Sequence, residues 1–187
     1  MNLKGKKILL GITGSIAAYK TINLIRLFIR EGAEVRVILT PFAEKFVTKG
    51  SISPLCGNPV YSEFFKEDGI WNSHVDLGAW ADLFLIAPVT ATTMAKMASG
   101  QADNLLIATY LSAKCQVAFA PAMDLDMYRH PATQANIKKL QHFGNHLIEP
   151  DSGELASGLF GKGRMREPEQ ILDCVMDLLH AKDEKKN

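Results

Sequence analysis

Residues 7–20 read KILLGITGSIAAYK, and this stretch decides the fold. Its first part, residues 7–12, is a short apolar run that is typical of a strand buried on both faces of a sheet. Apolar residues then recur at helical spacing from Ser15 to Arg30, and Gly32 ends the pattern. A strand, a glycine-containing turn and a helix in this order predict the first unit of a parallel α/β sheet.

The same alternation of strand and helix continues along the chain. Further strands are expected at 34–39, 83–87, 116–120 and 146–148, and further helices at 41–47, 92–99, 104–112, 131–143 and 168–180. This pattern predicts a Rossmann-like, doubly wound parallel sheet in a single α/β domain over residues 1–181, followed by a charged tail or linker at 182–187. The glycine-rich segment 151–166 is expected to be a functional or mobile loop.

Composition excludes several classes of protein. The chain has 187 residues, of which 47% are hydrophobic, and its 21 Lys and Arg nearly balance 20 Asp and Glu. These values argue against disorder and against a nucleic acid held by bulk charge. The apolar runs are too short for a membrane span or a signal peptide. Three well-separated cysteines, without zinc spacing, predict reduced thiols, a cytoplasmic location and no metal site.

Ligands of open α/β sheets bind beyond the carboxyl ends of the strands, so the segments after each strand are the candidates for a site. The first such turn contains Gly14 and Ser15, which would suit a phosphate through close backbone approach, N–H groups and a hydroxyl. The turn lacks the full dinucleotide fingerprint, and the second strand ends without an acidic ribose ligand. A plain glycine turn capped by Ser15 stays open as the simpler interpretation.

Two later strand ends also carry polar residues. The strand expected at 83–87 is followed by PVTATT (residues 88–93), which by itself is best explained as a helix-capping cluster. The strand expected at 116–120 is followed by PAMDLDMY (residues 121–128), which combines two methionines with two carboxylates. His74 lies at the start of a short predicted helix, and a lone histidine in such a place is more often structural than catalytic.

Taken together, these segments resemble the flavin-containing cysteine decarboxylases. The resemblance follows the family's order over most of the chain, and each motif is weak alone while the ordered set is specific. The matching segments are GITGSIAAYK (residues 11–20), HVDL (74–77), WAD (80–82), APVTATT (87–93), DNLL (103–106), PAM (121–123) and GLFGKGRM (158–165).

The resemblance implies an enzyme that uses flavin mononucleotide (FMN) to decarboxylate 4′-phospho-N-pantothenoylcysteine to 4′-phosphopantetheine in coenzyme A biosynthesis. The flavin would oxidise the thiol to a thioaldehyde, which supplies an electron sink for the departing carboxylate. His74 matches the family's catalytic histidine. The positions that match its cofactor-binding residues are Gly14, Ser15, Ile16, Thr40, Thr90, Thr93 and Ala122. Those assigned to the substrate are Asp124, Met127, Lys162 and Arg164.

The resemblance also implies partners and alternatives. Members form homotrimers or dodecamers with flavin at the subunit contact, and many are fused to a C-terminal phosphopantothenate–cysteine ligase domain. Nucleic acid and membrane partners are not expected. Two other functions stay open: decarboxylation of a peptidyl cysteine to an enethiol, and a non-catalytic flavin-binding regulatory subunit. A flavin prenyltransferase shares the fold and ranks behind these.

Two positions depart from the family's pattern. Asp124 stands where the family usually has an asparagine that contacts the substrate carboxylate, and Ser157 stands where it has a cysteine that serves the last reduction. Either Asp124 is buried and protonated, or Lys162 or Arg164 neutralises it. Because a serine is a far poorer acid than a cysteine, either another donor replaces Ser157 or the enzyme releases an enethiol.

Overall fold

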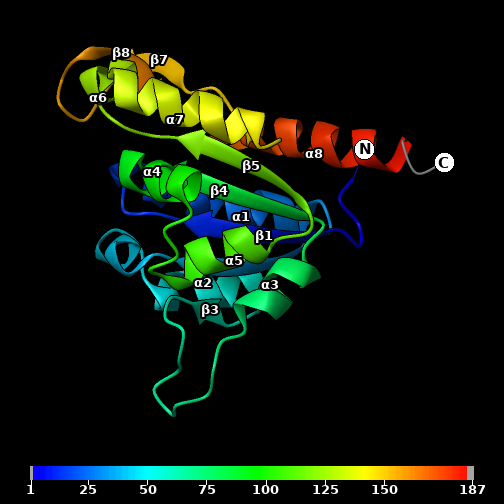
Figure 1. Cartoon of the computed structure of the whole chain (residues 1–187). Coiled ribbons are helices and arrows are strands. Elements are labelled where there is room, and N and C mark those ends of the chain that lie inside the picture. Colours follow the sequence, from blue (N-terminus) through cyan, green and yellow to red (C-terminus); the bar gives the residue numbers. More distant parts are fainter. Residues whose placement is uncertain (1, 185–187) are drawn as a thin grey trace.

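Six parallel strands form the central sheet, in the order β3-β2-β1-β4-β5-β6 (Figure 1). The computed structural model describes residues 2–184, and the side chains of residues 2–181. Strand order reverses between β1 and β4, which confirms the doubly wound fold and puts the ligand crevice beyond their carboxyl ends. The strands of this sheet are β1 (Lys7–Ile12), β2 (Glu34–Leu39), β3 (Val60–Tyr61), β4 (Leu83–Val89), β5 (Gln116–Pro121) and β6 (His146–Leu147).

Helices cover both faces of the sheet, because its central strands are apolar on both sides. The helices are η1 (Ile16–Lys20) and η2 (Pro41–Lys45), which are 3-10 helices, and α1 (Thr21–Arg30), α2 (Lys49–Cys56), α3 (His74–Trp80), α4 (Ala91–Ser99), α5 (Leu105–Ser112), α6 (Leu125–Arg129), α7 (Pro131–His142) and α8 (Pro168–Glu184). One core joins α1, α2 and α8 to the sheet, and a second core joins α3, α4, α5 and α7 to its other face.

The structure corrects several boundaries expected from the sequence. The helix expected from Ser15 to Arg30 is a 3-10 turn followed by α1, and the elements α2, β3 and α6 were not expected. Helix α8 continues to Glu184, past the helix end expected at His180, and the last part of the expected tail, residues 185–187, lies outside the described residues. In the described part of the chain, no helix combines the length and apolar character needed to cross a membrane.

The segment expected to be a loop at 151–166 is an antiparallel hairpin. It consists of β7 (Asp151–Glu154) and β8 (Phe160–Arg164), and it docks on the turn after β5 through a hydrogen bond from the Met123 N–H to the Gly163 carbonyl (3.0 Å). Figure 1 shows the hairpin beside α6 and α7, at the top of the molecule. The hairpin therefore covers one end of the crevice.

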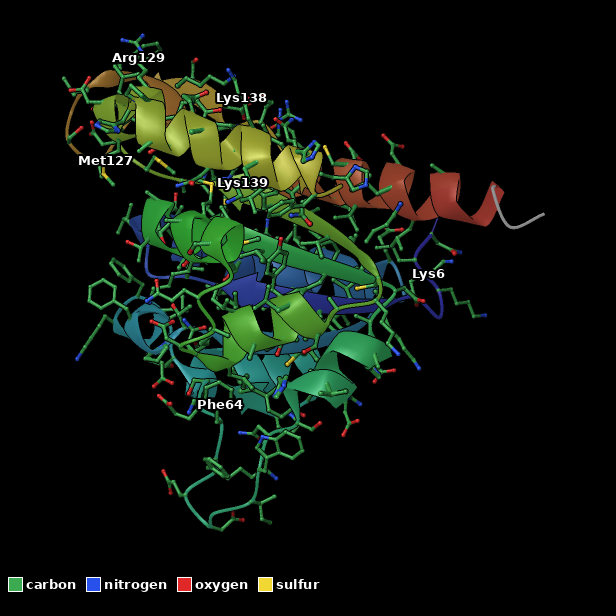
Figure 2. All side chains as sticks on the ribbon, viewed as in Figure 1. Lys6, Phe64, Met127, Arg129, Lys138 and Lys139 are labelled. Atoms are coloured by element: carbon green, nitrogen blue, oxygen red, sulfur yellow. The ribbon has the colours of Figure 1, made fainter. Side chains whose placement is uncertain are left out.

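A second extension, residues 62–73, projects from the opposite end of the molecule (Figure 1). We call it the arm. A bridge between Phe65 and Trp71 closes it, and Figure 2 shows Phe64 near the point where it leaves the domain. The side chains of Phe65, Ile70 and Trp71 are 61%, 56% and 50% exposed. Helix α3, which begins at His74, follows the arm directly.

Candidate active site

Two cavities flank the turn that follows β1, and their linings meet at Gly14 and Ser15. The first, which we call the threonine cavity, has a volume of about 570 Å³, and the second, the hairpin cavity, has about 330 Å³. The threonine cavity is lined in part by Gly14, Thr40, Thr90, Thr93 and Met127. The hairpin cavity is lined in part by Ser15, Lys20, Ala122, Asp124, Ser157 and Arg164.

Hydrogen bonds between the ends of β1 and β4 hold the threonine cavity in shape. The Thr13 hydroxyl donates to the Pro88 carbonyl (2.8 Å) and accepts from the Thr90 N–H (3.0 Å). The Thr90 hydroxyl in turn caps α4 by accepting from the Thr93 N–H (3.2 Å), and the two threonine hydroxyls lie 3.1 Å apart. The capping interpretation is therefore correct for Thr90. The sequence analysis missed Thr13, whose buried hydroxyl has no sequence signature.

The turn at Gly14 and Ser15 brings the backbone close to its neighbours. A Cβ atom at position 14 would lie 2.3 Å from Cδ1 of Phe42, so this position needs glycine if Phe42 is to stay in place. The Ser15 hydroxyl accepts from the Ala17 N–H (3.3 Å) and caps η1, as expected. The N–H groups at the start of a helical stretch point outward and favour a negatively charged ligand. This turn therefore lies where an anionic group could approach from the crevice.

A buried lysine ties the hairpin to the first helical turn. Lys20 is 7% exposed, and its ammonium donates to the Met165 carbonyl (2.9 Å) and to Oε1 of Glu167 (2.8 Å). Nη2 of Arg164 donates to the same Glu167 oxygen (2.8 Å). The hydrogen bond from Lys20, helped by Arg164, holds the pKa of Glu167 below its usual value. Lys20 is the last residue of the stretch 7–20, and its role could not be predicted from the sequence because its partners lie far along the chain.

The two departures from the family's pattern contact each other. The Ser157 hydroxyl, in the hairpin turn, hydrogen-bonds to Oδ2 of Asp124, and Oδ1 of Asp124 accepts from the Asp126 N–H (3.4 Å). Asp124 is only partly buried, which corrects the expectation of a buried carboxyl group. In the described part of the chain, no lysine or arginine nitrogen lies within salt-bridge distance of Asp124, so Lys162 and Arg164 do not neutralise it here.

Lys162, which we expect at the substrate, holds the hairpin against α6 and lines neither cavity. Its Nζ lies 2.7 Å from Oε2 of Glu149 and 5.7 Å from the centre of the Tyr128 ring. The Tyr128 hydroxyl donates to the same Glu149 oxygen (3.1 Å). Burial, and then Glu149, raise the pKa of Tyr128 to about 12, so the phenol keeps its proton at neutral pH.

Three further residues of the expected site line one or the other cavity. Met127, expected at the substrate, lies in the wall of the threonine cavity, and Figure 2 shows it at the end of the molecule that carries α6. Ile16 and Ala122, expected beside the cofactor, line the hairpin cavity. In the described part of the chain, no group of three or more His, Cys, Asp or Glu side chains could hold a metal ion.

His74 lines neither cavity. Its ring contacts Phe64 and Trp71 edge-on, with ring centres 6.3 and 5.7 Å away. Its buried Nδ1 atom has no hydrogen-bond partner among the described residues. The aromatic contacts fix the imidazole at the base of the arm. Within one chain, therefore, the structure does not bring the expected catalytic histidine to the expected cofactor and substrate residues.

Gly163→Ala is expected to release the hairpin from the domain. Gly163 has φ +154°, and an added Cβ would lie 2.3 Å from the Met123 carbonyl oxygen, a backbone atom that cannot move aside cheaply. A strained, overpacked contact of this kind costs about 1–3 kcal/mol. Limited proteolysis within 151–164 should accelerate by about tenfold or more. Phe160→Ala, an exposed residue of the same strand, is the control, and equal cleavage of both variants would contradict the docking role of Gly163.

Comparisons with known proteins agree with this architecture. A family model described as Flavoprotein matches residues 1–180. The Coenzyme A biosynthesis bifunctional protein CoaBC of Haemophilus influenzae is 43% identical over 185 residues, which are 98% of this chain and 46% of that relative. A protein from an unknown prokaryotic organism, named Cysteine/Cysteine sulfinic acid decarboxylase, is 59% identical over 137 residues, 73% of this chain and 38% of that relative. The chain thus spans less than half the length of either curated relative.

A solved structure shares the fold throughout. It is a mutant PPC decarboxylase in complex with pantothenoylaminoethenethiol, is 35% identical, and superposes with a TM-score of 0.81. The likeness covers 91% of this chain and 96% of that one. Such a likeness, together with the family's name, supports a flavin as the cofactor. Because the family model accounts for residues 1–180 and the related structure shares the same arrangement, this chain belongs to the Flavoprotein family.

Proposed function

We propose that this chain catalyses the FMN-dependent decarboxylation of phosphopantothenoylcysteine to 4′-phosphopantetheine, a step of coenzyme A synthesis. The observation that carries the proposal is the pair of cavities that meet at Gly14 and Ser15, one rich in threonine hydroxyls and the other charged and covered by a hairpin. The likeness to CoaBC and to PPC decarboxylase supports this choice of reaction. The proposal concerns the decarboxylation alone.

The threonine cavity fits a mononucleotide. Gly14 and Phe42 lie in its wall, together with Thr90 and Thr93 and their hydroxyls, and the Ser15 hydroxyl lies at the adjoining turn. The absence of an acidic residue in 39–41, at the end of β2, removes the usual ribose ligand of a dinucleotide and favours FMN. A bound flavin would supply a two-electron acceptor for the substrate thiol, so that the carboxylate can leave.

The hairpin cavity would hold the substrate acid. Arg164 lines it with a guanidinium that is fixed by Glu167, and a guanidinium suits a carboxylate or a phosphate. The hairpin covers this cavity, which would shield the reacting group from water. The reduced thiols of Cys56, Cys115 and Cys174 also fit a reducing, cytoplasmic location for the enzyme.

His74 would reach the substrate from a second copy of the chain. In one chain it lies beside the arm and lines neither cavity, yet its buried Nδ1 is left without a partner among the described residues. An imidazole held this way can move a proton at the substrate only if a neighbouring subunit presents a cavity to it. We therefore propose a homo-oligomer, a homotrimer or a dodecamer built from trimers, with the reaction site at the subunit contact.

A second candidate function is decarboxylation of a small cysteine-type amino acid. The relative that is 59% identical carries the name Cysteine/Cysteine sulfinic acid decarboxylase, and this chain has a carboxylate, Asp124, facing the substrate cavity. The same cavities and the same histidine would serve both reactions. The two candidates therefore differ only in what is attached to the cysteine nitrogen.

Incubation with phosphopantothenoylcysteine tests the main proposal. The purified chain should be yellow, or become so with added FMN, and should release carbon dioxide from this substrate. Mass spectrometry should then find a decarboxylated thiol. The enethiol differs from 4′-phosphopantetheine by the mass of two hydrogens, so the product mass shows whether the final reduction occurs with Ser157 in place of cysteine. A colourless chain that takes up no FMN would overturn the proposal. Flavin uptake without turnover of any thiol acid would favour a regulatory subunit, and turnover of C-terminal cysteine peptides alone would favour a peptide decarboxylase.

A further inference from the structure

Asp124 and Ser157 come from different segments and meet across the hairpin cavity. Asp124 follows β5, Ser157 lies in the hairpin turn, and their side chains are hydrogen-bonded. We propose that this pair binds the free α-ammonium group of the substrate, so that the enzyme prefers cysteine-type amino acids whose nitrogen carries no acyl group. This inference rests on the second candidate of the proposed function, decarboxylation of a small cysteine-type amino acid in this cavity, and it makes an N-acylated substrate such as phosphopantothenoylcysteine the poorer one.

The backbone on both sides holds the pair in place. Next to Asp124, the Met123 N–H donates to the Gly163 carbonyl of β8 (3.0 Å), which fixes the turn against the hairpin. Around Ser157, the hairpin turn is closed by bonds from the Leu155 N–H to the Leu159 carbonyl (2.8 Å) and from the Gly158 N–H to the Leu155 carbonyl (2.9 Å). Two fixed backbones therefore keep the carboxylate and the hydroxyl at one place in the wall.

The nearby cations are engaged elsewhere, which leaves the charge of Asp124 for a ligand. Lys162 pairs with Glu149 at 2.7 Å, and both Lys20 and Arg164 pair with Glu167 at 2.8 Å. Glu154 also lines the cavity, and Lys20 and Arg164 in its wall are both paired with Glu167, so Asp124 keeps its own negative charge. A positively charged group on the substrate would balance it, whereas an uncharged amide would not.

The donor and acceptor count points the same way. A carboxylate offers only acceptors, and a serine hydroxyl that donates to it still has lone pairs to offer. An ammonium group brings three donors and a positive charge, while an acylated nitrogen brings one N–H and no charge. Hydrogen bonds between charged groups are about twice as strong as those between neutral ones. The pair should therefore discriminate by the charge on the substrate nitrogen.

The test compares cysteine with N-acetylcysteine, which has the same thiol and carboxylate but no ammonium. With the FMN-loaded enzyme, kcat/KM should favour cysteine by about tenfold or more, as one charge-assisted hydrogen bond predicts. Asp124→Asn should reduce this preference to near unity, mainly by lowering the value for cysteine. Asparagine caps a helix as well as aspartate does, so α6 should keep its start. The matched control is Asp126→Asn, an exposed carboxylate on the same helix that does not line the cavity.

Binding without turnover gives a second readout. Calorimetry with cysteamine and N-acetylcysteamine, which lack the carboxylate, should show tighter binding of cysteamine to the unaltered enzyme and no preference in Asp124→Asn. The inference would be overturned if the unaltered enzyme had equal kcat/KM for cysteine and N-acetylcysteine, or if Asp124→Asn lowered kcat/KM equally for both. Either result would leave the proposed function standing. If cysteine, N-acetylcysteine and phosphopantothenoylcysteine all stay intact with FMN bound, the proposed function itself fails.

Discussion

Ser15→Asp is expected to lower the affinity for FMN by about a thousandfold while the fold stays intact. Ser15 caps η1 by accepting from the Ala17 N–H (3.3 Å), and aspartate caps a helix start as well as serine does. The new carboxylate would face the phosphate that we place at this turn. Two like charges about 4 Å apart, at an effective dielectric of about 20, repel by about 4 kcal/mol. That energy corresponds to about three powers of ten in the dissociation constant.

Fluorescence titration of FMN measures this effect, and thermal unfolding of the flavin-free chain checks the fold. Ser15→Ala is the matched control, because it removes the hydroxyl without adding charge. It should weaken FMN binding by only about tenfold, the loss of one hydrogen bond. If the aspartate and alanine variants bind FMN equally, the phosphate does not lie at this turn.

The second large effect is expected for His74→Asn, which should lower the rate of decarboxylation by about a hundredfold to ten thousandfold. The change removes the group that we propose moves a proton at the substrate. Asparagine keeps a polar side chain at the start of α3, and the residue lines neither cavity, so FMN should remain bound. Single-turnover release of carbon dioxide, at a measured flavin content, separates loss of chemistry from loss of cofactor.

Mixing the two damaged chains shows whether the site lies between subunits. A Ser15→Asp subunit keeps His74, and a His74→Asn subunit keeps its cofactor turn. If the site forms between subunits, trimers that contain both chains should regain activity at about a third of their sites, because one of the three subunit contacts joins an intact turn to an intact His74. If each chain completes its own site, mixing restores nothing, because every site carries one defect. Co-expression with two different tags, followed by purification through both, provides the mixed species.

The central sheet could be predicted from the sequence because its inner strands are continuous apolar runs. Residues 7–12 and 34–39 form strands as expected, since burial on both faces leaves a strong local signal. The helix at 49–56 was missed, because it contains Pro54 and carries few apolar residues. The short strand at 60–61 was missed as well, since two residues are too few for periodicity to show.

The hairpin at 151–164 could not be predicted, because its residues are glycine-rich and do not alternate between polar and apolar. Contacts with residues outside the segment stabilise it. The Met123 N–H donates a hydrogen bond to the Gly163 carbonyl, and Lys162 forms a salt bridge with Glu149. Dependence on contacts between distant segments also limited the prediction of the site. Strand-end residues such as Thr90 follow from local order along the chain, whereas the contact between Asp124 and Ser157 joins residues far apart in sequence.

The separation of the two cavities has a consequence for how such enzymes change over evolution. The walls of the threonine cavity come from strand ends whose hydroxyls also bridge β1 and β4, so mutations there endanger the scaffold itself. Much of the polar wall of the hairpin cavity comes from one contiguous segment, residues 154–165. New substrates could therefore be acquired by altering this segment together with its partner Asp124. Grafting this segment and its partner residue between relatives should transfer substrate selectivity while the threonine cavity, which we propose holds the mononucleotide, stays unchanged.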